Sequence, residues 1–249
     1  MYYYIFNPAA NAGRAKKLKD KIFKTLNDYE IAGEFLETLK PGDGYNLAKE
    51  AKENGIKTVV VIGGDGTVNE IAQNLINTDI ALGIIPTGEN NIFAKLLGIE
   101  NWKKAIEILL PRKLKEINVG KVKTENNERY FCAYLKIEKT QKSPTIWQKL
   151  SKEIPRTPFE LHVEIEEKLE ANTLTDLVII NNPAIESDSF NIFISNQGNV
   201  PTKLSFKNIK IRTKKSIPTI IDGENFGFTP LEIELIPKGL KVIVPREIF

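Results

Sequence analysis

Three glycines surround a single aspartate directly after a strongly apolar segment. The loop consists of Gly63, Gly64, Asp65, Gly66 and Thr67. Glycines let backbone N–H groups turn toward a phosphate and approach it closely. A carboxylate between them can hold Mg2+ or orient a reacting hydroxyl. This spacing predicts a phosphate-binding loop in which Asp65 has a chemical role, and a tight turn between a strand and a helix is the simpler alternative.

Thr67 and Glu70 have the spacing of a capping box, in which each side chain accepts the backbone N–H of the other residue at the start of a helix. We therefore expect a helix from Val68 to Ile76 that these two residues cap. A structural role and a role at the phosphate are equally favoured for both. No Lys-Ser or Lys-Thr pair follows the glycines, which excludes a Walker A loop.

A second candidate acid lies near the end of the chain, where Asp222-Gly223-Glu224 follows an apolar segment. Asp-Gly is a strong signal for a two-residue hairpin turn. On local sequence alone the turn is the favoured interpretation, and a catalytic role for Asp222 is the alternative. The two roles are compatible with each other.

The composition limits the other kinds of chemistry. His162 is the only histidine, which excludes a zinc site with two histidine ligands. Cys132 is the only cysteine, which excludes an intrachain disulfide and fits a reducing compartment. Lys and Arg number 35 against 32 Asp and Glu, a balance too even for a nucleic-acid-binding protein. We expect His162 on the exposed face of a strand and Cys132 in the core.

A basic run without any acid lies between residues 203 and 215. Its members are Lys203, Lys207, Lys210, Arg212, Lys214 and Lys215. Lys210, Arg212 and Lys214 would share one face of a strand, because successive side chains alternate between faces. A solvated face is the default interpretation, and a patch that contacts anionic lipid head groups is the alternative.

Strand and helix signals alternate through the first half of the chain. Continuous apolar runs at 58–62 and 81–85 are typical of strands buried on both faces. Apolar residues recur every four positions from Leu18 to Leu26, as in an amphipathic helix. The alternation predicts an α/β domain over residues 1–116, with a parallel sheet and helices on both faces. Ligands bind at the carboxyl ends of parallel strands, which is where Asp65 falls.

From residue 117 onward the pattern changes to many short strands. Residues 159–165 alternate strictly between apolar and polar side chains. Such strands predict a mostly antiparallel β-sandwich over residues 117–249, with the option that the last strand returns to the first domain. No targeting signal and no apolar segment long enough to span a membrane is visible. We therefore expect a cytoplasmic protein whose membrane contact, if any, is peripheral.

Residues 63–70, with the sequence Gly-Gly-Asp-Gly-Thr-Val-Asn-Glu, resemble the signature of the diacylglycerol kinase catalytic domain family. This family includes bacterial lipid kinases and sphingosine kinases, and its superfamily also contains NAD kinases and phosphofructokinases. Three further segments resemble parts of the same family. Residues 7–14 are similar to its opening Asn-Pro and glycine turn, 82–99 to its second nucleotide loop, and 221–224 to its closing segment.

The resemblance implies an ATP- and Mg2+-dependent kinase that phosphorylates the hydroxyl of a lipid substrate. It places the nucleotide against Asn7, Gly63, Gly64, Gly66, Thr67, Gly88, Glu89 and Asn91. Asp65 is then a catalytic group and the ligand of the metal. Asp222 is the base for the substrate hydroxyl, supported by Glu224, and the second domain closes the site across a cleft. The resemblance makes a site role the favoured interpretation for Asp222, and no nucleic acid partner is expected.

The sequence departs from the family at four positions. Where the second loop of the family has Thr, Gly and Asp, this chain has Glu89, Asn90 and Ile92. Asn118 stands where the family has an Asp that belongs to its metal and water network. One alternative function is therefore an impaired or non-catalytic relic that binds nucleotide or lipid. An NAD kinase-like enzyme is a second alternative, against which the segment 68–70 argues.

Overall fold

The computed structural model describes residues 2–139, 156–166, 168–181, 187–196 and 200–246. The chain divides into two compact units. Unit 1 comprises Met1–Val119 together with Pro237–Phe249, and unit 2 comprises Gly120–Ile236. The expected division lay at residue 116. The first part of unit 1 continues to Val119, and its second part is the end of the chain, for which the prediction had left open a return of the last strand to the first domain.

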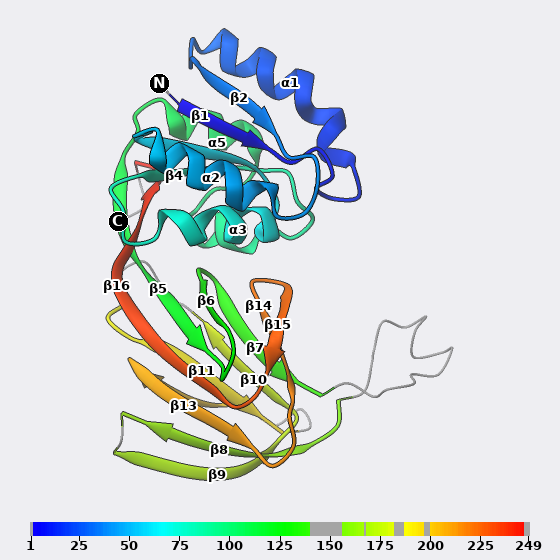
Figure 1. The fold of residues 1–249 in the computed structure, drawn as a ribbon, viewed down its shortest axis with the longest axis vertical. Coiled ribbons are helices and arrows are strands. Elements are labelled where there is room, and N and C mark those ends of the chain that lie inside the picture. Colours follow the sequence, from blue (N-terminus) through cyan, green and yellow to red (C-terminus); the bar gives the residue numbers. More distant parts are fainter. Residues whose placement is uncertain (1, 140–155, 167, 182–186, 197–199, 247–249) are drawn as a thin grey trace. The chain divides into compact units, whose positions relative to one another are not determined.

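A parallel sheet forms the centre of unit 1 (Figure 1). Its strands are β1 (Tyr2–Phe6), β2 (Gly33–Glu37), β3 (Thr58–Gly63) and β4 (Ala81–Pro86), in the order β2-β1-β3-β4. The end of β16 (Leu231–Ile243) pairs with β4, also in parallel. Every residue of β3 and β4 is buried, as the continuous apolar runs predicted.

In the described part of unit 1, five helices accompany this sheet. They are α1 (Arg14–Asp28), α2 (Asp43–Glu53), α3 (Asp65–Leu75), α4 (Ile92–Leu96) and α5 (Trp102–Leu109). Helix α2 packs on α3, whereas α1 packs on α5, so the helices form two groups (Figure 1). The period-four residues of α1 face inward, because Ile22 and Leu26 are fully buried. Because the four strands β1 to β4 run in parallel, their carboxyl ends lie along one edge of the sheet.

Unit 2 is a sandwich of mostly antiparallel strands. One sheet has the order β12-β11-β10-β7-β14-β15, and the other contains β16-β13-β8-β9 with β5 and β6 beside it. The bounds are β5 (Leu114–Lys123), β6 (Glu128–Phe131), β7 (Tyr134–Glu138), β8 (Phe159–Ile165), β9 (Leu169–Thr175), β10 (Leu177–Asn181), β11 (Phe190–Ser195), β12 (Thr202–Phe206), β13 (Asn208–Thr213), β14 (Pro218–Ile221) and β15 (Glu224–Phe228). Both sheets contribute apolar side chains to one core, in which Phe131 packs near Phe190 and Phe190 near Phe206.

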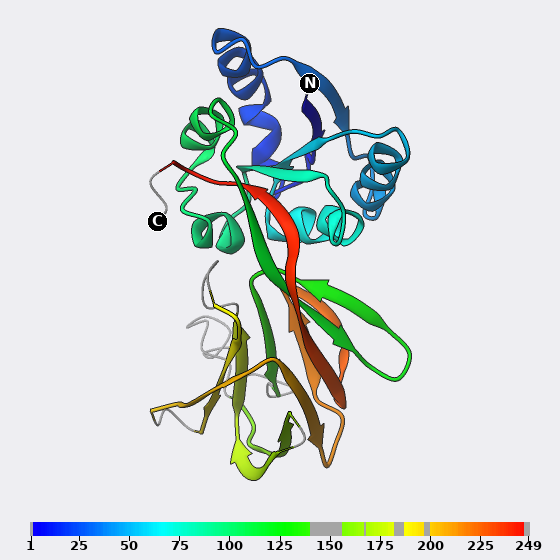
Figure 2. The same cartoon turned by 90° about the vertical axis from the view of Figure 1, so that its left-hand side faces the viewer.

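The predicted fold class is confirmed: a parallel α/β sheet is followed by a mostly antiparallel sandwich. Figure 2 shows the red C-terminal part of β16 within unit 1. Across the described residues, no helix combines the length and apolar character that a membrane span requires. Cys132 is buried as expected, and His162 is partly exposed on β8, where its Nδ1 lies 2.8 Å from Asn172 Oδ1.

Candidate active site

The loop between β3 and α3 ends in a helix that no side chain caps. Helix α3 begins at Asp65, three residues earlier than the predicted capping box requires, and Gly64 is its N-cap residue. The first turn of an α-helix has backbone N–H groups without a partner inside the helix, and they carry a partial positive charge. This end of α3 is therefore suited to an anion, as the glycine pattern predicted.

The loops that follow β3 and β4 touch each other through backbone atoms. A Cβ atom placed on Gly88 would lie only 2.5 Å from the Cα atom of Gly64. The N–H of Thr87 donates to the carbonyl of Gly63 at 2.9 Å. The amide of Asn91 closes the second loop, since it accepts from the N–H of Gly88 and donates to its carbonyl, both at 2.9 Å. Glycine is thus required at position 88 by close approach of the two chains.

Asp65 links the same two loops through its side chain. Its Oδ1 accepts the N–H of Phe93, in the first turn of α4, at 3.0 Å. The carboxylate is half-buried, and it belongs to no cluster of three or more His, Cys, Asp or Glu side chains among the described residues. A cation held here would draw one protein carboxylate and take its other ligands from phosphate and water, which is how Mg2+ is commonly bound.

Asn7 joins the end of β1 to this site. Its Nδ2 donates to Thr67 Oγ1 at 2.8 Å, and its Oδ1 accepts the N–H of Ala9 at 2.9 Å. The structure therefore brings together most of the residues that the sequence singled out in the first domain. They are Asn7, Gly63, Gly64, Asp65, Gly66, Thr67, Gly88 and Asn91.

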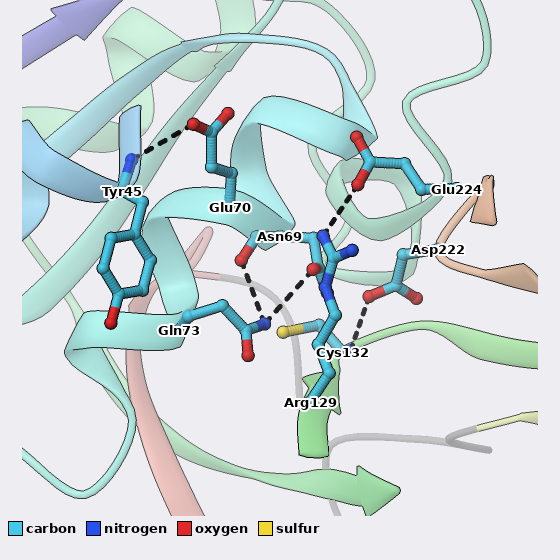
Figure 3. A network of polar contacts seen from close by, with 8 residues as sticks. All are labelled: Tyr45, Asn69, Glu70, Gln73, Arg129, Cys132, Asp222 and Glu224. Atoms are coloured by element: carbon cyan, nitrogen blue, oxygen red, sulfur yellow. Dashed lines mark hydrogen bonds and ion pairs between the residues drawn. The ribbon is translucent and has the colours of Figure 1, made fainter. Parts of the chain in front are cut away.

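The predicted capping box is wrong. Glu70 does not reach back to the start of α3, because its Oε1 accepts the N–H of Tyr45 in the first turn of α2 at 3.2 Å (Figure 3). Asn74, one turn further along α3, donates to the carbonyl of the same Tyr45 at 2.8 Å. A Cβ on Gly44 would lie 3.2 Å from Glu70 Cδ, so a glycine also lets α2 approach. Glu70 therefore positions a neighbouring helix.

The structure describes two of the departures from the family. Glu89 is exposed, and the N–H of Phe93, in the helix that follows it, donates to Asp65. Asn118 is buried at 7% exposure, and its Oδ1 accepts the N–H of Lys238 at 2.8 Å. Lys238 has a φ of +52°, which L-residues rarely adopt, so Asn118 helps to hold an unfavourable backbone conformation.

Two threonines that sequence reasoning missed lie at the same edge of the sheet. Thr38 directly follows β2, is buried, and donates its N–H to the carbonyl of Phe6 at 2.9 Å. Thr87 directly follows β4, and its buried Oγ1 has no hydrogen-bond partner among the residues that the structure describes. The available signal was their position, since each is the first residue after a parallel strand.

In unit 2, Asp222 and Gly223 form the turn between β14 and β15. Both have positive φ, +47° and +92°, which confirms the hairpin that Asp-Gly predicted. The Asp222 carboxylate is 3% exposed and accepts backbone N–H groups from the β6–β7 turn. Glu224 is more accessible, and its Oε2 accepts from the Arg129 guanidinium at 2.7 Å (Figure 3).

The basic run of β13 is accompanied by acids from the neighbouring strand. Lys210 Nζ lies 3.1 Å from Glu164, Arg212 lies 3.7 Å from the same carboxylate, and Lys214 lies 3.6 Å from Glu160. Residues 203–215 contain no acid, but acidic side chains of the neighbouring strand lie beside them in the folded protein. The expected shared face is present, but its charge is of both signs.

The site in unit 1 combines an uncapped helix end, two glycine loops in backbone contact and one aspartate between them. Residues 1–122 match the model of the diacylglycerol kinase catalytic domain. The resemblance predicted from the sequence motifs is confirmed.

Bacterial proteins are similar to part or nearly all of the chain. A Streptococcus pneumoniae protein named as a lipid kinase is 30% identical over 197 residues, which are 78% of this chain and 60% of that protein. The chain thus spans less than two thirds of that relative. The diacylglycerol kinase of Bacillus subtilis is 24% identical over 297 residues, covering 98% of this chain and 96% of the relative.

Solved structures show the same fold. A diacylglycerol kinase from Bacillus anthracis has a TM-score of 0.84 at 20% identity, with 100% of this chain and 98% of the other covered. An NAD kinase from Archaeoglobus fulgidus in complex with ATP has a TM-score of 0.63 at 13% identity, with 99% and 95% covered. At these identities the likeness extends to the fold alone.

Proposed function

We propose that this protein is a kinase that transfers a phosphoryl group from ATP to the hydroxyl of a diacylglycerol-like lipid. The observation that carries the proposal is the backbone contact of Gly64 with Gly88, beside the uncapped N-terminus of α3. Side chains at those two positions would strike the backbone of the opposite loop. The glycines therefore let the two loops meet beside the helix end, whose dipole attracts a phosphate.

The residues of unit 1 fit a complex of nucleotide and Mg2+. Backbone N–H groups at the start of α3 would hold phosphate oxygens, and Asn7 with Thr67 would orient the loop around them. Asp65 would hold the metal, while its bond to the Phe93 N–H fixes the direction of the carboxylate. Mg2+ supplies charge neutralisation for the phosphates when it is bound. Gly63, Gly66, Gly88, Glu89 and Asn91 complete the proposed nucleotide site.

The acids of the β14–β15 hairpin are the candidates for the base that accepts the proton of the lipid hydroxyl. In phosphoryl transfer the hydroxyl oxygen bonds to the γ-phosphorus, the bond to the bridging oxygen breaks, and ADP leaves. The hydroxyl proton then passes to a carboxylate. We propose Asp222 as that base and Glu224 as its support.

Two other functions remain for the experiment to decide. An NAD kinase-like reaction is favoured by the fold likeness to the NAD kinase, and it would use the same nucleotide loops. A relic that binds nucleotide without catalysis is favoured by the amide of Asn118, which replaces the family carboxylate and is bonded to backbone. Each of these functions predicts a different distribution of transferred phosphate among the acceptors from the one that a lipid kinase would give.

The test is a transfer assay with radiolabelled ATP and Mg2+ over diacylglycerol in mixed micelles, a sphingoid base and NAD. We expect label in the lipid and in neither of the other acceptors. Asp65→Asn should lower that rate by at least ~100-fold, the scale of a lost charge-stabilising group. Asp65→Asn keeps an oxygen for the Phe93 N–H, so the protein should remain folded.

A matched control exists on the neighbouring helix. Asp43 also lies in the first turn of its helix, where its Oδ2 accepts the N–H groups of Leu39 and Lys40. Asp43→Asn therefore changes the same kind of interaction outside the glycine loops, and it should keep most of the transfer rate. Label in NAD alone would overturn the lipid proposal, and no transfer to any acceptor despite ATP binding would support the relic.

We also propose that the protein acts in the cytoplasm and meets its lipid substrate at a membrane surface. The substrate class requires this contact, because a diacylglycerol stays in the bilayer through its acyl chains. The contact would be peripheral. Vesicle binding by the face of β13 that carries Lys210 and Arg212 provides a measurement of it.

A further inference from the structure

Three consecutive backbone N–H groups converge on the Asp222 carboxylate. Cys132 donates to Oδ2 at 2.8 Å, while Ala133 and Tyr134 both donate to Oδ1 at 2.9 Å. The carboxylate is 3% exposed, so bulk water does not replace these donors. Figure 3 shows Asp222 aimed at the Cys132 backbone. The contacts join two segments that are about 90 residues apart in the sequence.

Successive N–H groups that point to one place form an anion-binding concavity in proteins. Such a nest in a buried turn needs an acceptor, because unpaired buried N–H groups are strongly unfavourable. We infer that the Cys132–Tyr134 turn is an anion-binding nest filled by the Asp222 carboxylate. Asp222 is thus a positioning residue for the β6–β7 turn, and only its additional role as base rests on the proposed function.

The backbone at Asp222 makes a clean test available. Its φ of +47° lies in the left-handed region, which Gly and Asn adopt at low cost. Asp222→Gly removes the carboxylate, leaves the turn without its acceptor and opens a space about the size of formate. Asp222→Asn keeps the size and one oxygen, but its Nδ2 donor would face the Cys132 N–H in place of Oδ2.

A matched control lies in the same unit. Glu166 has a φ of +51° between β8 and β9, is exposed, and accepts one backbone N–H, that of Lys207. Glu166→Gly therefore repeats the backbone change and the loss of a carboxylate without a buried nest. It separates the effect of the anion from that of the left-handed turn.

The experiment compares wild type, Asp222→Gly, Asp222→Asn and Glu166→Gly in sodium formate and in sodium chloride at equal ionic strength. Melting temperature and amide hydrogen exchange of residues 132–134 are measured. In chloride, Asp222→Gly should melt roughly 5 °C or more below wild type. Its Ala133 and Tyr134 amides should exchange at least ~10-fold faster, since local opening controls exchange.

Formate should reverse both changes in Asp222→Gly and should leave the other three proteins unchanged. Asp222→Asn should melt below wild type in either salt, which keeps the inference testable if Asp222→Gly fails to fold. Asp222→Asn as stable as wild type, or a formate effect of equal size in all variants, would overturn the nest. Both readouts are independent of phosphate transfer, so failure of the proposed function would not change them.

Discussion

At the scale of single residues, Glu89 provides a test of the proposed nucleotide site. A carboxylate about 4 Å from a phosphate charge is repelled by about 4 kcal/mol at an effective dielectric of 20, but by only about 1 kcal/mol in water. Glu89 is exposed and in contact with solvent, so the smaller figure applies. Glu89→Thr should therefore tighten ATP binding by roughly fivefold.

Calorimetric titration of ATP with and without Mg2+ measures this effect. Glu100→Thr, at another exposed acid of unit 1, is the control and should leave affinity unchanged. Tightening by more than ~100-fold would show that Glu89 points into a degenerate site. Loss of the Mg2+-dependent binding would show that Glu89 is a substitute metal ligand.

The buried thiol of Cys132 makes the free energy of unfolding depend on pH. Burial, and next the charge of Asp222, raise the pKa of the Cys132 thiol well above its ordinary value of 9.0. The folded state then keeps a proton that the unfolded chain releases, so stability is fully present below pH 9 and is lost as the pH rises further.

The loss has a predictable size. One retained proton corresponds to about 1.4 kcal/mol of unfolding free energy per pH unit. Between pH 9 and pH 10, wild type should therefore lose about 1 kcal/mol more than Cys132→Ala. Urea unfolding at each pH measures this difference. Parallel pH profiles for the two proteins would show that the thiol titrates normally in the folded state.

At the scale of elements, the close contact of the two glycine loops makes a prediction about Gly88. Its Cβ would overlap with the Gly64 backbone, which cannot move aside as a flexible side chain can. Gly88→Ala should separate the loops, lower ATP affinity by at least ~10-fold and destabilise unit 1 by about 1–3 kcal/mol. Titration calorimetry and urea unfolding measure the two effects.

Gly227→Ala is the control for that substitution. Its nearest atom would be an ordinary 3.9 Å from the new Cβ, and Gly227 does not have a positive φ. This variant should bind ATP as wild type does. Unchanged ATP affinity in Gly88→Ala would argue against a nucleotide site that depends on the contact of the two loops.

The sequence was sufficient for elements whose signal is local and continuous. The runs in β3 and β4 predicted buried parallel strands, and the Asp222-Gly223 pair predicted its hairpin. The capping box failed because the partner of Glu70 lies on α2, about 25 residues earlier in the chain. The bond from Phe93 to Asp65 was equally invisible, since no periodicity relates two loops at the ends of different strands.

At the scale of the whole molecule, the basic run shows why charge cannot be judged from one strand. Residues 203–215 contain no acid, yet Glu160 and Glu164 lie beside Lys210, Arg212 and Lys214 across the β8–β13 pair. Pairing between distant segments sets the charge of a sheet face. The sequence predicted which side chains share the face, but not the acids that accompany them.

This balance predicts weak attraction to anionic membranes, with a clear way to strengthen it. Because both acids offset cations, wild type should bind vesicles with anionic lipid weakly, and added salt should weaken binding further. Glu160→Gln with Glu164→Gln removes two negative charges from this face at nearly constant side-chain volume, and it should increase binding several-fold at low salt. Sedimentation with anionic and neutral vesicles measures the difference. Equal binding to the two vesicle types, or no gain in the double variant, would show that the face of β13 is not the surface that meets the membrane.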